Sequence, residues 1–248
     1  MKIAIIVLSG GEDISYSNGK TYDEMVDTIK DTWAKRLPNN VDVFFNYGFI
    51  PNFDNNPKLG ETKIYKDMIL HGVQETYDNM NEKVLNSLSY FEQNTNYNFV
   101  FRCCCGSYVN VQNLVNFLSN KPRKKFYCGV PTPYHYKEEK FKFASGSGFF
   151  FSKDVLKIIT ENLDKMISEK IALDDVTIGY HLRNFGINIY PGARRKDIGD
   201  LPENRKDLID LKCLTKNDLT EYHFHMRHNA EGMKTLHRLF KEKTYCKK

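Results

Sequence analysis

The sequence has few of the features that mark specialised proteins. It has one tryptophan and eight prolines, and it lacks internal repeats and low-complexity tracts. Its first apolar run, residues 3–8, is too short for a signal-peptide core, and no later run approaches the ~20 apolar residues that a membrane-spanning helix needs. No Asn-x-Ser/Thr acceptor site occurs, although asparagine is abundant. These absences predict a soluble, cytoplasmic chain without a leader or a membrane anchor.

The sequence also lacks a strong excess of charge. The 36 Lys and Arg against 31 Asp and Glu leave a net charge of +5. Two basic clusters, residues 121–125 and 194–196, could meet a phosphate, but solvated surface is the simpler interpretation. No zinc-finger spacing and no RNA- or DNA-binding motif is present. We therefore expect no nucleic-acid partner.

The six cysteines lack the spacing of a disulfide framework, and three are contiguous: Cys103, Cys104 and Cys105. In an extended segment Cys103 and Cys105 share one face and Cys104 takes the other, so at most two thiolates converge. A zinc site usually needs three or four protein ligands. Small thiols that fill a tight pocket are the favoured interpretation, ahead of a metal site. Redox sensing is the weakest alternative, because only Arg102 lies nearby to lower a thiol pKa.

Strand-like and helix-like patterns alternate along the chain, which predicts an α/β fold with a mainly parallel central sheet flanked by helices. Strands are predicted at residues 2–8, 41–45, 97–102, 124–130 and 187–192, with a glycine-broken extended segment at 143–152. Helices are predicted from a Thr21–Glu24 capping box to near Pro38, at 79–92, after the cap residue Asn110, at 153–168, and at 173–186 with Gly186 as the stop. We expect one domain over residues 1–228 and a basic C-terminal tail over 229–248.

Three polar segments directly follow predicted strands: residues 9–11, 103–107 and 145–148. In open α/β sheets, ligands bind beyond the carboxyl ends of the strands. These segments therefore predict where the functional site lies.

Five stretches resemble, in the correct order, segments of the Fringe-like and beta-1,3-galactosyltransferase group of glycosyltransferases, which have the GT-A fold. The stretches are DTIKDTW (27–33), DMILHGVQETYDNMNEKVLNSLSYF (67–91), FASGSGFFFSKDVL (143–156), ALDDVTIGYHL (172–182) and YHFHMRHN (222–229). The likeness spans roughly residues 3 to 228. It implies an inverting transfer of a sugar from a nucleotide-sugar, usually a UDP-sugar, to a hydroxyl of a glycan or glycoprotein acceptor. Such an enzyme without an anchor is expected to be cytosolic or of a viral type.

The resemblance also implies a divalent metal, Mn²⁺ or Mg²⁺, held by an Asp-x-Asp motif at the end of the third strand. The segment 98–111 is similar to the family throughout, but Cys104, Cys105 and Gly106 stand where those aspartates belong. Metal dependence and metal independence both stay open. If a metal binds, His225 could add a ligand, as a histidine does in the family.

Without a metal, cationic side chains would have to stabilise the diphosphate, because arginine can grip phosphate in a bidentate way. The candidates are Arg102, Arg194 or Arg195, and the cluster His223, His225 and Arg227.

The acidic pair Asp174 and Asp175 supplies the candidate catalytic base. Both lie at a predicted helix N-terminus, where the helix dipole favours an ionised carboxylate. Helix capping explains Asp174 equally well, so Asp175 is the favoured base.

The remaining predictions concern donor binding and packing. The further candidate donor-binding residues are Ser9, Gly10, Gly11, Asn79, Lys83, Gly146 and Gly148. Tyr77 could help to orient the donor, and Trp33 is expected in the core. The second hypothesis is a non-catalytic relative that binds a nucleotide or a glycan.

Overall fold

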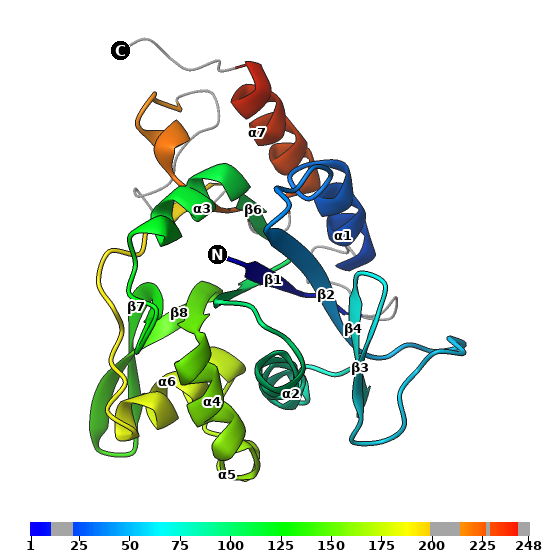
Figure 1. Cartoon of the computed structure of the whole chain (residues 1–248), viewed down its shortest axis with the longest axis vertical. Coiled ribbons are helices and arrows are strands. Elements are labelled where there is room, and N and C mark those ends of the chain that lie inside the picture. Colours follow the sequence, from blue (N-terminus) through cyan, green and yellow to red (C-terminus); the bar gives the residue numbers. More distant parts are fainter. Residues whose placement is uncertain (11–21, 199–213, 227–228, 243–248) are drawn as a thin grey trace.

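The computed structural model describes residues 1–10, 22–198, 214–226 and 229–242. Thr21, Gly11 and Arg227 lie outside the described residues, so the capping box and these two site predictions are not considered further. The centre of the molecule is a seven-stranded sheet with the order β3-β4-β2-β1-β5-β8-β7 (Figure 1). The strands are β1 (Ile3–Leu8), β2 (Val41–Phe49), β3 (Thr62–Tyr65), β4 (Met68–Gln74), β5 (Phe99–Cys104), β7 (Tyr127–Tyr136) and β8 (Glu139–Ser152).

The four middle strands, β4, β2, β1 and β5, are parallel, and the strands on either side pair antiparallel. β1 lies between β2 and β5, so Leu8 is opposite both Asn46 and Cys104. All six residues of β1 are buried, as expected for a near-continuous apolar strand covered on both faces. The carboxyl ends of β1, β2 and β5 therefore meet at one edge of the sheet.

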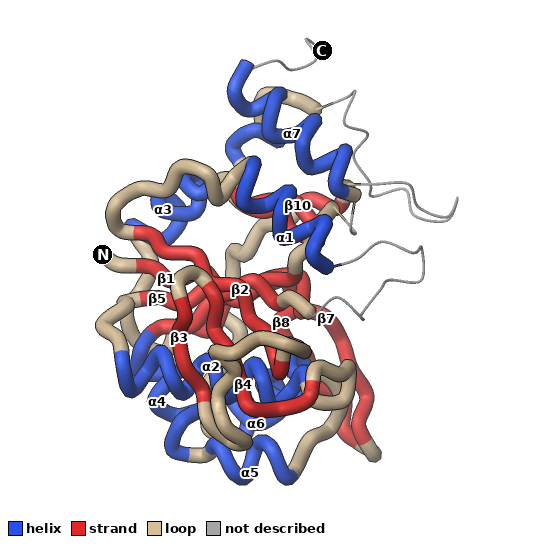
Figure 2. The backbone as a smooth tube through the Cα atoms, turned by 90° about the vertical axis from the view of Figure 1, so that its right-hand side faces the viewer, coloured by secondary structure: helices blue, strands red, loops and turns tan. Residues whose placement is uncertain are grey.

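Two groups of helices cover the two faces of the sheet (Figures 1 and 2). Alternate residues of β1 point to opposite sides: Ile3, Ile5 and Val7 belong to one apolar cluster, and Ala4, Ile6 and Leu8 to the other. The first cluster includes residues of α1 (Tyr22–Asp31), α3 (Val111–Ser119) and α7 (Ala230–Glu242), and the second includes residues of α2 (Met80–Asn94), α4 (Lys153–Glu161), α5 (Leu163–Ser168) and α6 (Asp174–Asn184).

A small second sheet, with the order β6-β10-β9, stands beside the end of β5. Its strands are β6 (Ser107–Val109), β9 (Lys196–Asp197) and β10 (His223–His225), and a 3₁₀ turn, η2 (Asp218–Thr220), precedes β10. β10 pairs antiparallel with β6, which places His225 opposite Ser107, and parallel with β9, which places His225 opposite Asp197. This sheet brings late segments of the chain to the cysteine turn between β5 and β6.

Most predicted elements are confirmed, including the cap at Asn110, whose side chain accepts a hydrogen bond from Asn113 N (3.0 Å). Gly186 ends α6 with a φ of 75°, as a helix stop requires. Trp33 is buried, and its indole N–H donates to the Ser107 carbonyl (3.1 Å).

Other predictions need correction. Residues 187–192 are not a strand: they make only an isolated bridge between Ile189 and Tyr127 of the edge strand β7. Pro191, which has no backbone N–H, and Gly192, with a φ of 97°, follow and do not continue the pairing. The predicted helix 153–168 breaks at Asn162 into α4 and α5. Residues 143–152 form the second part of strand β8, which its glycines do not interrupt. The β3–β4 hairpin was not predicted. Within 229–248, expected as a tail, α7 buries Met233 and Leu236 in the core.

Candidate active site

The predicted residues at the end of β1 lie directly beside the cysteine turn, because Leu8 pairs with Cys104. Ser9 is buried, and its hydroxyl donates to the Asn46 carbonyl (2.7 Å), which ties the ends of β1 and β2 together. Gly10 is buried next to it. These two residues form one wall of the sheet edge where the sequence predicted the nucleotide.

Lys83 reaches the same wall from α2. Its ammonium group is buried, donates to the Ser9 carbonyl (2.9 Å) and pairs with the carboxylate of Glu75. Burial lowers the pKa of Lys83, and the attraction of Glu75 opposes that shift. A small cavity of about 20 Å³ adjoins this group and is lined in part by Ser9, Gly10 and Tyr77.

Asn79 does not join this wall. Its side chain is half-buried and donates to the Gln74 carbonyl (2.9 Å), so it holds the turn before α2. Tyr77, at 64% exposure, borders the small cavity from the solvent side. The structure therefore brings Ser9, Gly10 and Lys83 together and leaves Asn79 aside.

The acidic pair forms a second wall, at the N-terminus of α6. Asp174 is 1% exposed and Arg102, from β5, is 2% exposed. Arg102 Nη2 lies 2.8 Å from both Asp174 carboxylate oxygens, and Nη1 donates to the Gly146 carbonyl. The guanidinium also lies 5.3 Å from the centre of the Phe149 ring. Arg102 and Asp174 thus neutralise each other inside the protein.

Asp175 lies in front of this buried ion pair and is half-buried. Its Oδ2 accepts a hydrogen bond from Gly146 N (2.6 Å) and its Oδ1 accepts one from Val176 N (2.9 Å). Burial raises the pKa of Asp175, and Arg102 acts in the opposite direction. A Cβ at position 146 would lie 2.7 Å from Asp175 Oδ2, so only glycine lets the backbone approach this carboxylate so closely.

The cysteine turn forms the third wall. As predicted from strand alternation, Cys104 differs in environment from Cys103 and Cys105. Cys103 and Cys105 are fully buried in the apolar cluster on the α1 side, whereas Cys104 is half-buried. The Cys104 sulfur lies 3.5 Å from Ser107 Oγ. Hydrogen bonding and charge from His225, with help from Ser107 and Arg102, outweigh burial and lower the pKa of Cys104 to about 7.

His225 is held by a chain of charged side chains. Its Nδ1 lies 3.1 Å from Asp197 Oδ1, and the other oxygen of Asp197 accepts a hydrogen bond from Arg195 Nη2 (3.0 Å). The interactions with Asp197 and Cys104 overcome burial and raise the pKa of His225 to about 9. Hydrogen bonds and charge from His225 and Arg195 outweigh burial and lower the pKa of Asp197 to about 2. At neutral pH, His225 is therefore an imidazolium.

Arg195 connects the second and third walls. Its Nη1 donates to Ser145 Oγ (2.9 Å) and to Ser147 Oγ, both on the glycine-containing part of β8. Its Nε is buried and has no partner within the described part of the chain. Arg195 thus remains a donor close to the sheet edge. Arg194 lies elsewhere: its side chain is 67% exposed, pairs loosely with Glu221 (4.0 Å) and lines a separate pocket of about 590 Å³ beside α3.

His223 and Gly148 lie beneath the surface of the site. His223 is buried, its Nε2 lies 2.9 Å from Ser107 Oγ, and burial holds its pKa well below the usual range, so it is neutral. A Cβ at Gly148 would lie 2.7 Å from His223 and from Phe101. Gly148 therefore serves this internal packing, and neither residue supplies charge to a ligand.

The donor set does not fit the Mg²⁺ or Mn²⁺ that the resemblance implies. These cations prefer several oxygen ligands, yet the corresponding positions offer the thiol of Cys104, the buried Cys105 and the turn residue Gly106, whose carbonyl accepts from Met226 N. The Nδ1 of His225 is already engaged with Asp197. Within the described ranges, no three His, Cys, Asp or Glu side chains converge as a metal site would require.

The sheet order, the flanking helices and a site at the carboxyl ends of the strands define a GT-A-type glycosyltransferase fold. A solved glycosyltransferase involved in the glycosylation of the major capsid of PBCV-1 shares this fold: it is 11% identical, with a TM-score of 0.50 over 96% of this chain and 100% of that one. Residues 26–192, more than half of the chain, match the galactosyltransferase family, and the protein belongs to that family.

Among curated proteins, the chain is similar to beta-1,3-galactosyltransferase 1 of human and of mouse. Each is 25% identical over 153 residues, which cover 54% of this chain and 46% of the relative. The chain thus spans about half the length of these relatives. Within the described residues, no helix combines the length and apolarity needed to cross a bilayer.

The sequence analysis named neither Glu75 nor Asp197 as a site residue, and it included Ser107, Ser145 and Ser147 only as parts of the segments 103–107 and 145–148. Asp197 follows the basic cluster 194–196, and nothing in that local pattern links it to His225, which is 28 residues away. Ser107 pairs with His223, 116 residues away. The segment 145–148 was singled out by its place after a predicted strand and by the family resemblance, but neither signal identified its two serines as partners of Arg195.

Proposed function

We propose that the protein transfers a sugar with inversion from a nucleotide-sugar, a UDP-sugar by family likeness, to an acceptor hydroxyl, with Asp175 as the general base. The observation that carries this proposal is the placement of Asp175. Its half-buried carboxylate lies at the edge of the sheet where we place the ligands, and it accepts a hydrogen bond from Gly146 N. The neighbouring Asp174 is instead paired with Arg102.

In this reaction Asp175 accepts the proton of the acceptor hydroxyl as the acceptor oxygen attacks the anomeric carbon. The new C–O bond forms as the bond from that carbon to the diphosphate breaks, and the nucleoside diphosphate departs with the electron pair. Burial raises the pKa of Asp175, which makes its carboxylate a stronger base than one in water. Asp174 and Arg102 position the start of α6 and take no proton.

The departing diphosphate needs positive charge, and two of the predicted cations can supply it. The charge of Arg102 is neutralised by Asp174 in a buried ion pair, and His223 is uncharged. His225 carries a charge at neutral pH, and Arg195 lies between it and the β8 serines. We assign the diphosphate to His225 and Arg195, with donor binding independent of Mn²⁺ and Mg²⁺. The nucleoside is assigned to the wall formed by Ser9, Gly10 and Lys83.

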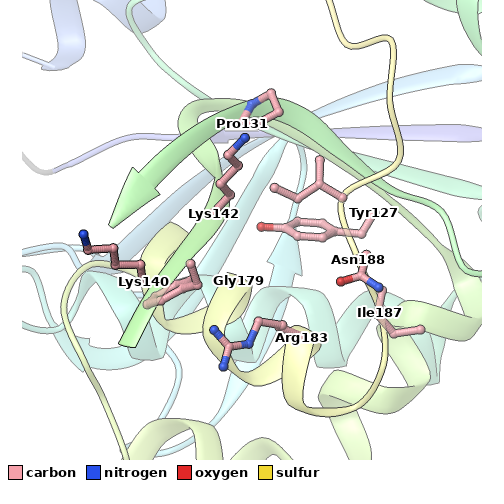
Figure 3. A pocket seen from close by; sticks show the side chains of 10 residues that line it. Tyr127, Pro131, Lys140, Lys142, Gly179, Arg183, Ile187 and Asn188 are labelled. Atoms are coloured by element: carbon pink, nitrogen blue, oxygen red, sulfur yellow. The ribbon is translucent and has the colours of Figure 1, made fainter. Parts of the chain in front are cut away.

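A pocket farther along α6 suits the acceptor (Figure 3). It encloses about 440 Å³ and is lined by Tyr127 and Phe141, by Gly179 of α6, and by the cations Lys142 and Arg183, among others. Aromatic rings next to hydrogen-bonding cations suit a saccharide. Gly179 follows Asp175 by four residues, a rise of ~6 Å along a helix, so an acceptor in this pocket could present a hydroxyl to the base.

The test combines donor binding and turnover. Purified protein is incubated with a panel of nucleotide-sugars, with and without acceptor saccharides, and donor hydrolysis and sugar transfer are measured in EDTA and in Mn²⁺. We expect a UDP-sugar to be consumed in both buffers. A protein that binds no nucleotide-sugar and consumes none would overturn the proposal.

A second candidate function is a non-catalytic protein that binds a nucleotide or a glycan. It is favoured by one observation, the loss of every carboxylate from the positions of the metal-binding motif at 104–106. The same experiment separates the two functions, because this candidate predicts uridine diphosphate binding without turnover of any donor.

A further inference from the structure

We propose that Cys104 is a reactive nucleophile, activated by His225 and Asp197, and that peroxides and carbon electrophiles modify it at the mouth of the donor site. The location of this site rests on the proposed function, because the donor site is itself a proposal. The reactivity of the thiol is a separate matter that can be tested without any substrate.

The three side chains are brought together by the small second sheet. β10 places His225 opposite Ser107 on β6 and opposite Asp197 on β9. The Met226 N–H donates to the Gly106 carbonyl and closes β10 onto the cysteine turn. His225 Nδ1 lies 3.1 Å from Asp197 Oδ1. Ser107, which is opposite His225 in the small sheet, lies with its Oγ 3.5 Å from the Cys104 sulfur, and the interaction of Cys104 with His225 lowers the pKa of the thiol and raises that of the imidazole. This is a thiol–imidazole–carboxylate arrangement.

Other charged and polar groups around the sulfur act in the same direction. Arg102 from β5 attracts the thiolate, and Ser107 Oγ hydrogen-bonds it at 3.5 Å. Arg195 fixes Asp197 from behind. An imidazolium beside a cysteine is a known way to keep the thiolate populated near neutral pH.

The three other described cysteines provide a contrast within the same protein. Cys103, Cys105 and Cys128 are fully buried, and burial raises the pKa values of Cys103 and Cys128. Cys104 is the one described cysteine with partial exposure. Accessibility and ionisation therefore single out the same sulfur.

The chemistry with hydrogen peroxide balances within this cluster. The Cys104 thiolate attacks one peroxide oxygen, the S–O bond forms and the O–O bond breaks. Sulfur is oxidised by two electrons to a sulfenic acid and the peroxide is reduced. The leaving hydroxide takes the proton of the His225 imidazolium and departs as water. With iodoacetamide, the thiolate forms an S–C bond and iodide leaves.

Modification of Cys104 would block the donor site. The diphosphate is assigned to His225, which interacts with Cys104, and to Arg195, which binds Asp197 of the same cluster. Conversely, a bound diphosphate would compete for the imidazolium and repel the thiolate, which raises the pKa of the thiol. Uridine diphosphate is therefore expected to slow the modification of Cys104 both by covering the sulfur and by reducing its ionised fraction.

The test measures alkylation of the folded full chain by iodoacetamide at pH 7, followed site by site with peptide mass spectrometry. Cys213 and Cys246 are replaced by serine to give a simple background. Cys104 should react at least ~10-fold faster than Cys103, Cys105 and Cys128, and His225→Asn should slow it by ~10-fold, as the thiolate fraction falls toward that of a thiol with an ordinary pKa. His135→Asn, at an exposed histidine on β7, is the matched control and should change nothing.

Two outcomes overturn the reactivity of Cys104: labelling no faster than that of the buried cysteines, or a folded His225→Asn protein that labels at the parental rate. If His225→Asn does not fold, the parental protein decides the matter through its rate against pH. The rate should rise with a midpoint near 7, and a midpoint of about 8.5 or higher would contradict the proposal.

A further arm tests the location. Saturating uridine diphosphate should slow Cys104 labelling by at least ~10-fold if the ionised fraction collapses as argued, and pretreatment with peroxide should abolish nucleotide binding. Fast labelling that the nucleotide does not affect would overturn the link to the donor site. Absence of sugar transfer alone would count against the proposed function and leave the reactivity result unchanged.

Discussion

The N-terminus of α6 and the cysteine turn face the same sheet edge but obtain their charges differently. At α6, Asp174 and Arg102 form a buried pair that neutralises itself and leaves Asp175 facing outward. At the cysteine turn, the local sequence supplies only thiols and glycine. The charged side chains are contributed by Asp197 of β9 and His225 of β10. One wall carries an acidic pair, and the other has no carboxylate at residues 104–106.

This difference teaches that the charges of one wall of a site can come from residues distant in sequence. A charged group needs only to be near in space, since electrostatic attraction depends on distance and local polarity and not on chain order. We expect the α6 wall to govern the chemical step and the cysteine wall to govern donor binding.

The largest expected effect comes from Asp175→Asn. Removing the base should lower sugar transfer by 10²–10⁴-fold, the usual contribution of general-base catalysis, because the amide cannot accept the hydroxyl proton. Uridine diphosphate affinity should stay within about 3-fold by calorimetry, since Asp175 is assigned to the acceptor side. Asp164→Asn, at an exposed aspartate on α5, is the control and should transfer at the parental rate. Transfer near that rate in Asp175→Asn would refute the assignment.

Breaking the buried pair should affect folding more than binding. Arg102→Met leaves Asp174 as an uncompensated buried charge and should lower the free energy of unfolding by ~3–5 kcal/mol in urea titrations. The double variant Arg102→Met/Asp174→Leu should recover part of that loss, because it removes both charges. A double variant that loses as much as the sum of both single variants would show that the pair does not act as a unit.

At the cysteine wall, His225→Asn should weaken uridine diphosphate binding by about 10-fold, the loss of one charge-assisted hydrogen bond. The pKa of His225 is raised from 6.5 to about 9, so its charged form is favoured in the fold. Its contribution to stability is therefore complete below pH 6.5 and is lost as the pH rises through about 9. Thermal melting between pH 6 and 10 should show this decline, and it should be absent in His225→Asn.

The smallest effect is expected from metal removal. Because no carboxylate is available at residues 104–106, EDTA should change uridine diphosphate affinity by less than ~2-fold. Cys104→Asp/Gly106→Asp would sharpen the comparison by restoring an acidic pair, and this variant should gain a dependence on Mn²⁺. Donor binding by the parental protein that collapses in EDTA and returns with Mn²⁺ would contradict the metal-independent arrangement.

Much of the fold could be predicted because its signals are local. The apolar run at 3–8, the helical spacing in 79–92 and the cap at Asn110 depend on residues a few positions apart, and all three are confirmed. The strand predicted at 187–192 was wrong. Strand pairing depends on which edge of the sheet is open, and a local sequence pattern carries no information about that edge. The β3–β4 hairpin was missed among turn-forming residues.

The candidate site divides in the same way. Asp174 and Asp175 were found because a helix N-terminus and a motif lie within one short segment. The thiols were also sorted correctly, since alternation along a strand separates Cys104 from its neighbours. The partners of Cys104 and of Asp174 could not be found locally, because the Arg102–Asp174 pair spans 72 residues.

The sequence by itself determined the alternation of strands and helices, the family likeness, the acidic pair and the three contiguous cysteines. These features depend on residues close together in the sequence, because the spacing of such residues decides which face of a helix or strand each one occupies. Only the tertiary structure decided which candidate cations lie at the sheet edge and which are internal. That distinction depends on burial and on partners many residues away, so Arg102 and His223 become internal while Arg195 and His225 remain at the sheet edge.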